Sequence, residues 1–125
     1  MPMKLEDMMK AALAVVPKIS PQEAINLIDS GKAVAVDVRD KAEVDALGKI
    51  KGAVRAPRGR LEFKADPASP HYNAALSADK TILVYCHSGA RATLAAKTLK
   101  DMGFDDVRLL GGFQDWIDAG GSVVR

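Results

Sequence analysis

The sequence predicts an α/β fold, in which a mainly parallel sheet carries helices on both faces. Three observations lead to this class. Strand-forming runs and helical patterns alternate from residue 18 onward, which is typical of strands joined by helical crossovers. The runs 33–39 and 80–86 are largely apolar, as strands buried on both faces are. At 125 residues, the chain can bury one core without disulfides or metals.

The first third of the chain carries clear helix signals. Apolar residues at helical spacing predict an amphipathic helix laid on the domain: Leu5, Met8, Met9, Ala12, Leu13 and Val16. The second helix begins after Ser20, which forms a capping box with Glu23, and Pro21 suits its first position. Gly31 ends this helix, and the first strand follows.

The rest of the chain continues the alternation. The segment 58–80, which contains prolines, is predicted to be an irregular excursion with one or two helical turns. The other predicted elements are a short helix at 40–48, a brief strand at 52–57, a strong strand at 80–86, a strong helix at 90–104, a strand at 105–112 and a helix at 112–121.

Composition excludes several classes of function. Eighteen basic and sixteen acidic residues give a net charge of +2 and are interspersed, too mild a balance for a charge-driven nucleic-acid binder. Glu6, Asp7 and Lys10 interrupt the N-terminal apolar residues, which argues against a signal peptide or membrane span. A membrane-surface role is the minor alternative for the first helix. We expect a cytoplasmic protein with no nucleic-acid or membrane partner.

The only cysteine, Cys86, lies where the strand 80–86 passes into a helix. In parallel sheets ligands bind beyond the carboxyl ends of the strands, and Cys86 lies at one of these ends. In the stretch "CHSGAR", Gly89 permits a tight turn with inward-facing N–H groups, and the next helix presents its positive end. Both features favour a thiolate, and Arg91 adds a permanent positive charge. The alternative is that Cys86 is only a small apolar core residue.

A metal site is not expected, and no cofactor is predicted. His87 is adjacent to Cys86 rather than suitably spaced, and the chain has no other cysteine.

Four motifs resemble the rhodanese domain. "DVRDKAE", "GKIKGAVRAP", "VYCHSGAR" and "GGFQDW" occur in its order and spacing and span about residues 18–120. The resemblance implies a five-stranded parallel sheet and a sulfurtransferase whose loop cysteine carries a persulfide. It makes Cys86 the nucleophile and assigns sulfur binding to backbone N–H groups of the loop: His87, Ser88, Gly89, Ala90 and Arg91. The predicted domains are an N-terminal amphipathic helical extension at 1–17 and a rhodanese-like domain at 18–125.

Other matching positions are expected to be structural. Asp37, Arg39 and Glu43 are predicted to form charge pairs near the strand end. Lys49 stands where the family commonly has histidine, with little functional consequence expected. Core or turn roles are predicted for Gly111, Gly112 and Trp116.

Arg58 follows the brief strand at 52–57 and is a candidate for contacting a substrate at the pocket mouth. A solvated surface arginine is an equal alternative for Arg58 and the favoured one for Arg60.

The predicted function is a rhodanese-type sulfurtransferase, similar to thiosulfate sulfurtransferases. Its partners are a small anionic sulfur donor and an external acceptor, either cyanide or a thiol, including a thiol of a partner protein. Two alternatives stay open. The first is a non-catalytic rhodanese-fold binding module, although such modules often lack the loop cysteine. The second is a cysteine phosphatase or arsenate reductase, which uses a similar cradle. Tyrosine-type phosphatases, however, have five residues between the cysteine and the arginine, and at the position where that arginine would stand this chain has Ala92.

Overall fold

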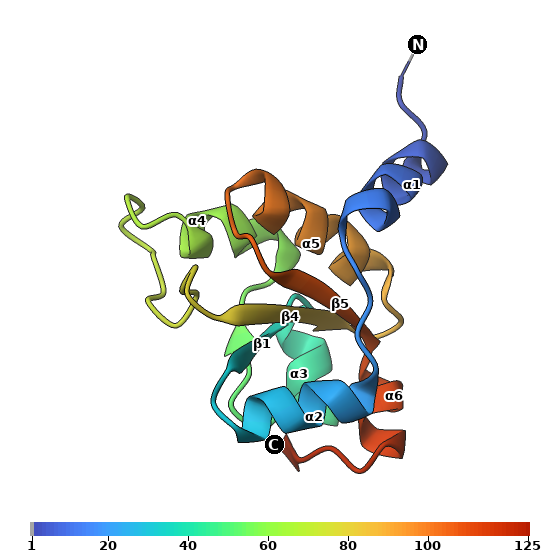
Figure 1. Ribbon diagram of the computed structural model, residues 1–125, viewed down its shortest axis with the longest axis vertical. Helices are drawn as coiled ribbons and strands as arrows, with labels where there is room; N and C mark the ends of the chain where they lie inside the picture. The colour runs from blue at the N-terminus through green and yellow to red at the C-terminus, as the bar shows by residue number, and fades with distance from the viewer. Residues whose placement is uncertain (1) are drawn as a thin grey trace.

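A four-stranded parallel sheet forms the centre of the computed structural model, which describes residues 2–125 (Figure 1). The strand order is β3-β1-β4-β5, and all three neighbouring pairs are parallel. The strands are β1 (Ala33–Asp37), β3 (Val54–Arg55), β4 (Thr81–Cys86) and β5 (Val107–Gly112). The predicted α/β class with a parallel sheet is therefore confirmed.

The predicted count of five strands in this sheet is wrong, because the sheet has four. Beside β5, Lys18 forms a single parallel bridge to Leu109. This segment cannot lengthen into a strand, since Pro17 has no N–H to donate and α2 starts at Pro21. The remaining strands, β2 (Lys49–Ile50) and β6 (Val123–Val124), pair with each other antiparallel in a separate sheet.

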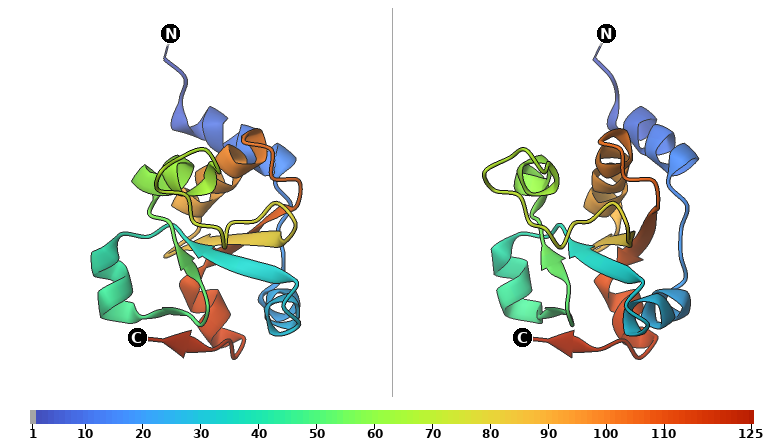
Figure 2. Two further views of the ribbon diagram at one scale, coloured as in Figure 1. Left: turned by 90° about the vertical axis from the view of Figure 1, so that its left-hand side faces the viewer. Right: turned by 60° about the vertical axis from the view of Figure 1, so that its left-hand side comes forward.

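Helices cover both faces of the sheet (Figures 1 and 2). On one face α1 packs against α5, which lies on β4 and β5, and α4 contacts α5. On the other face α2 contacts β1, and α6 contacts β5. The helical elements are α1 (Leu5–Val15), α2 (Pro21–Asp29), α3 (Lys41–Leu47), the short 3₁₀ helix η1 (Arg58–Arg60), α4 (Leu61–Ala65), α5 (Ala90–Asp101) and α6 (Phe113–Asp118).

Alternation along β4 divides the core into two clusters. Val84 and Cys86 join the cluster that packs under α5, whereas Leu83 and Tyr85 join the cluster that packs against α2 and α6. This alternation follows from the two-residue period of a strand. It aims the Cys86 side chain at the face that α5 covers.

The N-terminal helix packs against the domain less completely than predicted. Ala12 and Val16 are buried, but Leu5 is 63% exposed and Leu13 is 45% exposed. The predicted extension, residues 1–17, also includes Met1, which lies outside the described residues. Within residues 2–125, no helix has the length and apolar character needed to cross a membrane.

Candidate active site

Cys86 is the last residue of β4, and its side chain is buried. The loop that follows reaches α5 through Gly89, the N-cap residue, whose φ is +106°. Glycine adopts this left-handed conformation without the steric cost that a side chain would add. The predicted tight turn at Gly89 is therefore confirmed.

The Cys86 sulfur lies at the amino end of α5. Its Sγ accepts hydrogen bonds from the N–H of Gly89 at 3.0 Å and the N–H of Ala92 at 3.4 Å. The first N–H groups of a helix have no partner within the helix, and they lie at the positive end of its dipole. These N–H groups therefore favour negative charge at this end of α5, which is carried by Sγ itself when Cys86 is a thiolate.

Ala92 was missed in the sequence analysis, which assigned the cradle to residues 87–91. The signal was available, because Ala92 is the third residue of α5 and the third N–H of a helix has no intrahelical partner.

The loop is tied to the end of β5 and the start of α6. The C=O of His87 accepts a hydrogen bond from the N–H of Phe113 at 3.3 Å, and Ser88 forms an antiparallel bridge with Gly112. A β-carbon on Gly112 would lie 3.2 Å from the His87 carbonyl oxygen. The close approach of the two backbones thus favours glycine at position 112, as a turn role predicted. The His87 and Ser88 side chains are exposed.

Arg91 forms a two-pronged ion pair with Glu43. Its Nη1 lies 2.6 Å from Oε2 and its Nη2 lies 2.8 Å from Oε1. The hydrogen bonds from Arg91, aided by one from the Asp40 N–H, lower the pKa of Glu43 to about 2. Glu43 therefore takes part in charge pairing, as predicted, and the charge of Arg91 is balanced within the protein.

A second charge pair lies beside Tyr85, on the face of the sheet away from α5. Arg39 and Asp37 are both fully buried, and Arg39 Nη2 lies 2.7 Å from Asp37 Oδ2. Tyr85 donates to the same Oδ2 at 2.7 Å, and burial, assisted by the Asp37 charge, raises the pKa of Tyr85. The Arg39 guanidinium lies 4.3 Å from the centre of the Phe113 ring. This network confirms the structural pairing predicted for Asp37 and Arg39.

The structure does not bring Arg58 to the loop. Its guanidinium donates to Glu62 at 3.1 Å and to Thr98 Oγ1 at 3.1 Å. Thr98 lies seven residues beyond Arg91 on α5, which is about 10 Å along the helix axis. Arg60 is exposed, as the surface alternative predicted.

Two other predicted structural positions have structural contacts. Lys49 Nζ donates to the carbonyl of Ala53 at 2.9 Å. Trp116 is buried and donates to the carbonyl of Ser122 at 3.1 Å.

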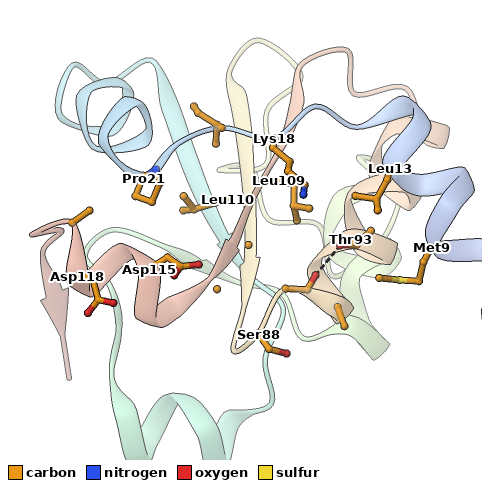
Figure 3. A pocket seen from close by; sticks show the side chains of 16 residues that line it. Met9, Leu13, Lys18, Pro21, Ser88, Thr93, Leu109, Leu110, Asp115 and Asp118 are labelled. Carbon is orange, nitrogen blue, oxygen red and sulfur yellow. Dashed lines mark hydrogen bonds between the residues drawn. The ribbon is translucent and has the colours of Figure 1, made fainter. Parts of the chain in front are cut away.

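A groove of about 820 Å³ borders the Cys86 loop (Figure 3). The loop residues Ser88, Gly89 and Ala90 form one border of the groove. Thr93 also lines it, and its hydroxyl donates a hydrogen bond to the Gly89 carbonyl at 2.8 Å. The other lining residues come from α1, from the segment that leads into α2 and the first residue of that helix, from the end of β5, and from α6 and the residue that follows it: Met9, Leu13, Lys18, Ile19, Pro21, Leu109, Leu110, Gly111, Gly112, Asp115, Asp118 and Ala119.

Two curated proteins and one solved structure illustrate the similarity. YrkF of Bacillus subtilis (strain 168), whose name proposes a sulfur carrier protein, is 32% identical over 103 residues. These residues are 81% of this chain and 51% of YrkF, so the chain spans about half of that protein. The thiosulfate:glutathione sulfurtransferase of Homo sapiens is 28% identical over 113 residues, covering 85% of this chain and 97% of that protein.

A solved structure from Rhodopseudomonas palustris matches nearly the whole chain. It has a TM-score of 0.86 and 39% sequence identity, and the match covers 99% of both chains. That protein is described as having unknown function, with tyrosine phosphatase suggested. The sequence model named rhodanese-like domain matches residues 20–119. With the fold, the Cys86 loop and this match together, the chain belongs to the rhodanese-like domain family.

Proposed function

We propose that this chain is a sulfurtransferase that carries sulfane sulfur as a persulfide on Cys86. The observation that carries the proposal is the position of Sγ, which accepts N–H bonds from Gly89 and Ala92 at the amino end of α5. Helix amides placed in this way stabilise a sulfur anion without a metal or a cofactor. Membership of the rhodanese-like family and the sulfurtransferase name of the human relative support the same activity.

The first half-reaction loads the enzyme. The Cys86 thiolate attacks the outer sulfur of a donor such as thiosulfate and forms a new S–S bond. The original S–S bond of the donor breaks, and sulfite leaves with its bonding electrons. The product is a Cys86 persulfide whose terminal sulfur bears the negative charge.

The second half-reaction unloads the sulfur. A nucleophile, either cyanide or a thiolate, attacks the terminal sulfur, and the Cys86 thiolate leaves with the electrons of the S–S bond. The products are thiocyanate or an external persulfide. Cys86 is the only cysteine of the chain, so a thiol acceptor must come from another molecule.

A phosphatase is the second candidate, because that activity is suggested for the Rhodopseudomonas palustris protein. Two features argue against it. Four residues, not five, separate Cys86 from Arg91. In addition, Arg91 is bound to Glu43 through both terminal nitrogens, so its guanidinium would have to leave that carboxylate to hold phosphate oxygens. The same features argue against an arsenate reductase.

A non-catalytic binding module remains the third alternative. The cysteine and the N–H groups that face its sulfur are both present, and this favours chemistry over simple binding.

The test is direct detection of the persulfide. After incubation with thiosulfate, intact-mass spectrometry should show the protein heavier by one sulfur atom. Cyanide or dithiothreitol should then remove that sulfur. Cys86→Ser is the control and should show no gain. A wild-type protein that gains no sulfur from any sulfane donor would contradict the proposal.

A further inference from the structure

The groove beside the Cys86 loop has an apolar centre and an acidic end. Figure 3 shows Leu109 and Leu110 in the middle, with Met9 and Leu13 of α1 on one side. Asp115 and Asp118 of α6 lie on the opposite side. Of the residues that the structure describes, 2–125, Lys18 is the one basic residue that lines the groove. This arrangement differs from a site for a small anion, which would be repelled by the two carboxylates.

The acidic end is not neutralised by the rest of the described chain. Among residues 2–125, the Asp115 carboxylate has no hydrogen bond or ion pair, and that of Asp118 accepts one hydrogen bond, from Gln114 at 2.8 Å. A β-carbon on Gly112 would lie 3.4 Å from Asp115 Oδ2. Because Gly112 bridges to Ser88, this uncompensated negative charge lies at the foot of the sulfur-binding loop.

The apolar side of the groove is also incompletely covered. Leu13 is 45% exposed and Met9 is half-buried. Both belong to α1, which precedes the segment 20–119 that matches the family. Apolar side chains gain about 25 cal/mol for each Å² removed from water, so this wall favours an apolar occupant. The groove volume of about 820 Å³ is in the range of ligand-binding clefts.

We propose that this groove binds an extended, basic and apolar segment of the polypeptide that accepts sulfur from Cys86. Apolar side chains of the segment cover Met9 and Leu13, and a lysine or arginine of the segment faces Asp115 and Asp118. The inference rests on the proposed function in one respect: a chain with a single cysteine must transfer sulfur to an external acceptor. A polypeptide bound here lies against Ser88, Gly89 and Ala90, and so alongside the loop that carries the sulfur.

The experiment measures binding and chemistry separately. The probe is a fluorescein-labelled peptide of about eight residues, with two leucines followed by two arginines and no cysteine. A matched peptide carries two glutamates in place of the arginines. Fluorescence polarisation is measured with the full chain, with Asp115→Asn/Asp118→Asn, and with Asp29→Asn/Asp105→Asn. The last variant makes the same change in net charge at exposed carboxylates that do not line the groove.

We expect saturable binding of the basic peptide, weakened about fivefold or more by Asp115→Asn/Asp118→Asn at low salt and not by the control variant, since exposed charge pairs contribute modestly. Leu13→Asn, which removes the apolar contact without adding charge, should weaken binding as well, and thermal melting should show that all variants fold. Equal binding of the two peptides, equal loss in the control variant, or no saturable binding would overturn the proposal. Concentration-dependent dimers that Leu13→Asn dissociates would overturn it too, by assigning the groove to a second copy.

Transfer of sulfur from thiosulfate to cyanide serves as an independent readout. It should not fall in the groove variants, because neither carboxylate bonds the Cys86 sulfur and the loss of negative charge beside the loop does not hinder an anionic donor. If the wild type transferred no sulfur but bound the basic peptide selectively, the proposed function would fail and the binding site would stand. A loss of cyanide turnover in Asp115→Asn/Asp118→Asn equal to the loss of peptide binding would contradict a docking role.

Discussion

Replacing Glu43 with glutamine should remove a specific part of the acid sensitivity of this fold. In the native protein, the Glu43 carboxylate accepts hydrogen bonds from both terminal nitrogens of Arg91, with N–O distances of 2.6 and 2.8 Å. These bonds lower the pKa of Glu43 to about 2. A carboxyl group with a depressed native pKa stabilises the fold above its unfolded pKa, which is about 4.3 for glutamate. That stabilisation is lost as the pH falls from about 4.5 toward 2.

The size of the effect follows from the shift and the exposure. A change from 4.5 to about 2 corresponds to about 3.4 kcal/mol at 1.36 kcal/mol per unit. The side chains of Arg91 and Glu43 are 37% and 30% exposed, so solvent screens the pair and the figure must be discounted. We expect the pair to contribute about 1–2 kcal/mol to the free energy of unfolding. The Glu43→Gln variant should be less stable than the wild type by this amount at pH 7, and the difference should shrink below pH 4.5.

Urea unfolding, followed at several pH values between 7 and the lowest at which the protein remains folded, measures this difference. Asp45→Asn is the matched control on the same helix. Asp45 pairs with Lys41 at 2.6 Å, but these side chains are 60% and 74% exposed, so its removal should change the pH dependence little. If wild type and Glu43→Gln lose stability in parallel as the pH falls, the coupling between Arg91 and Glu43 does not stabilise the fold.

Three further predictions concern the chemistry. Cys86→Ser should abolish thiocyanate formation while retaining the fold, because a hydroxyl is far less ionised and cannot carry a persulfide; circular dichroism and a thiocyanate assay check this, and more than trace turnover by the folded variant would place the nucleophile elsewhere. Arg91→Ala should lower kcat/KM for thiosulfate more than it shortens the persulfide lifetime. The substitution leaves the Glu43 carboxylate without its partner, which disfavours an arriving anion, whereas the backbone N–H groups that face the Cys86 sulfur remain. Equal turnover at low ionic strength would remove Arg91 from donor binding. The wild type should not appreciably hydrolyse p-nitrophenyl phosphate. The four-residue spacing between Cys86 and Arg91 holds a phosphoryl group away from in-line attack, and misplacement by about 1 Å can cost on the order of a hundredfold in rate. Cys86-dependent hydrolysis comparable to sulfur transfer would support the phosphatase alternative.

Local signals predicted much of the fold. The Ser20 cap is present, since its Oγ accepts the Glu23 N–H at 3.2 Å. The strand that ends at Cys86 and the helix that follows are also where the sequence places them. These features depend on neighbouring residues, so the propensities and capping patterns of a short stretch determine them.

Features that join distant segments were harder to predict. Arg91 and Glu43 are 48 residues apart, and no local pattern selects one as the partner of the other. The hydrogen bonds of Arg58 to Glu62 and Thr98 combine a near neighbour with a residue 40 positions away. The prediction of a fifth strand was wrong for a different reason. The family resemblance implied it, but in this chain Pro17 and Pro21 limit the segment around Lys18 to a single bridge with Leu109.

The buried pair of Asp37 and Arg39 has a consequence for how this sequence can diverge. Neither side chain is exposed to solvent, so removing one partner leaves an uncompensated interior charge, at a cost of about 3–5 kcal/mol. Whole domains of this kind are stable by only about 5–15 kcal/mol. A single substitution at either position would therefore remove a large part of the folding stability, whereas a joint replacement by apolar residues of similar volume need not. The two positions should drift through evolution as one unit, and Tyr85, which shares the Asp37 carboxylate, should be constrained with them.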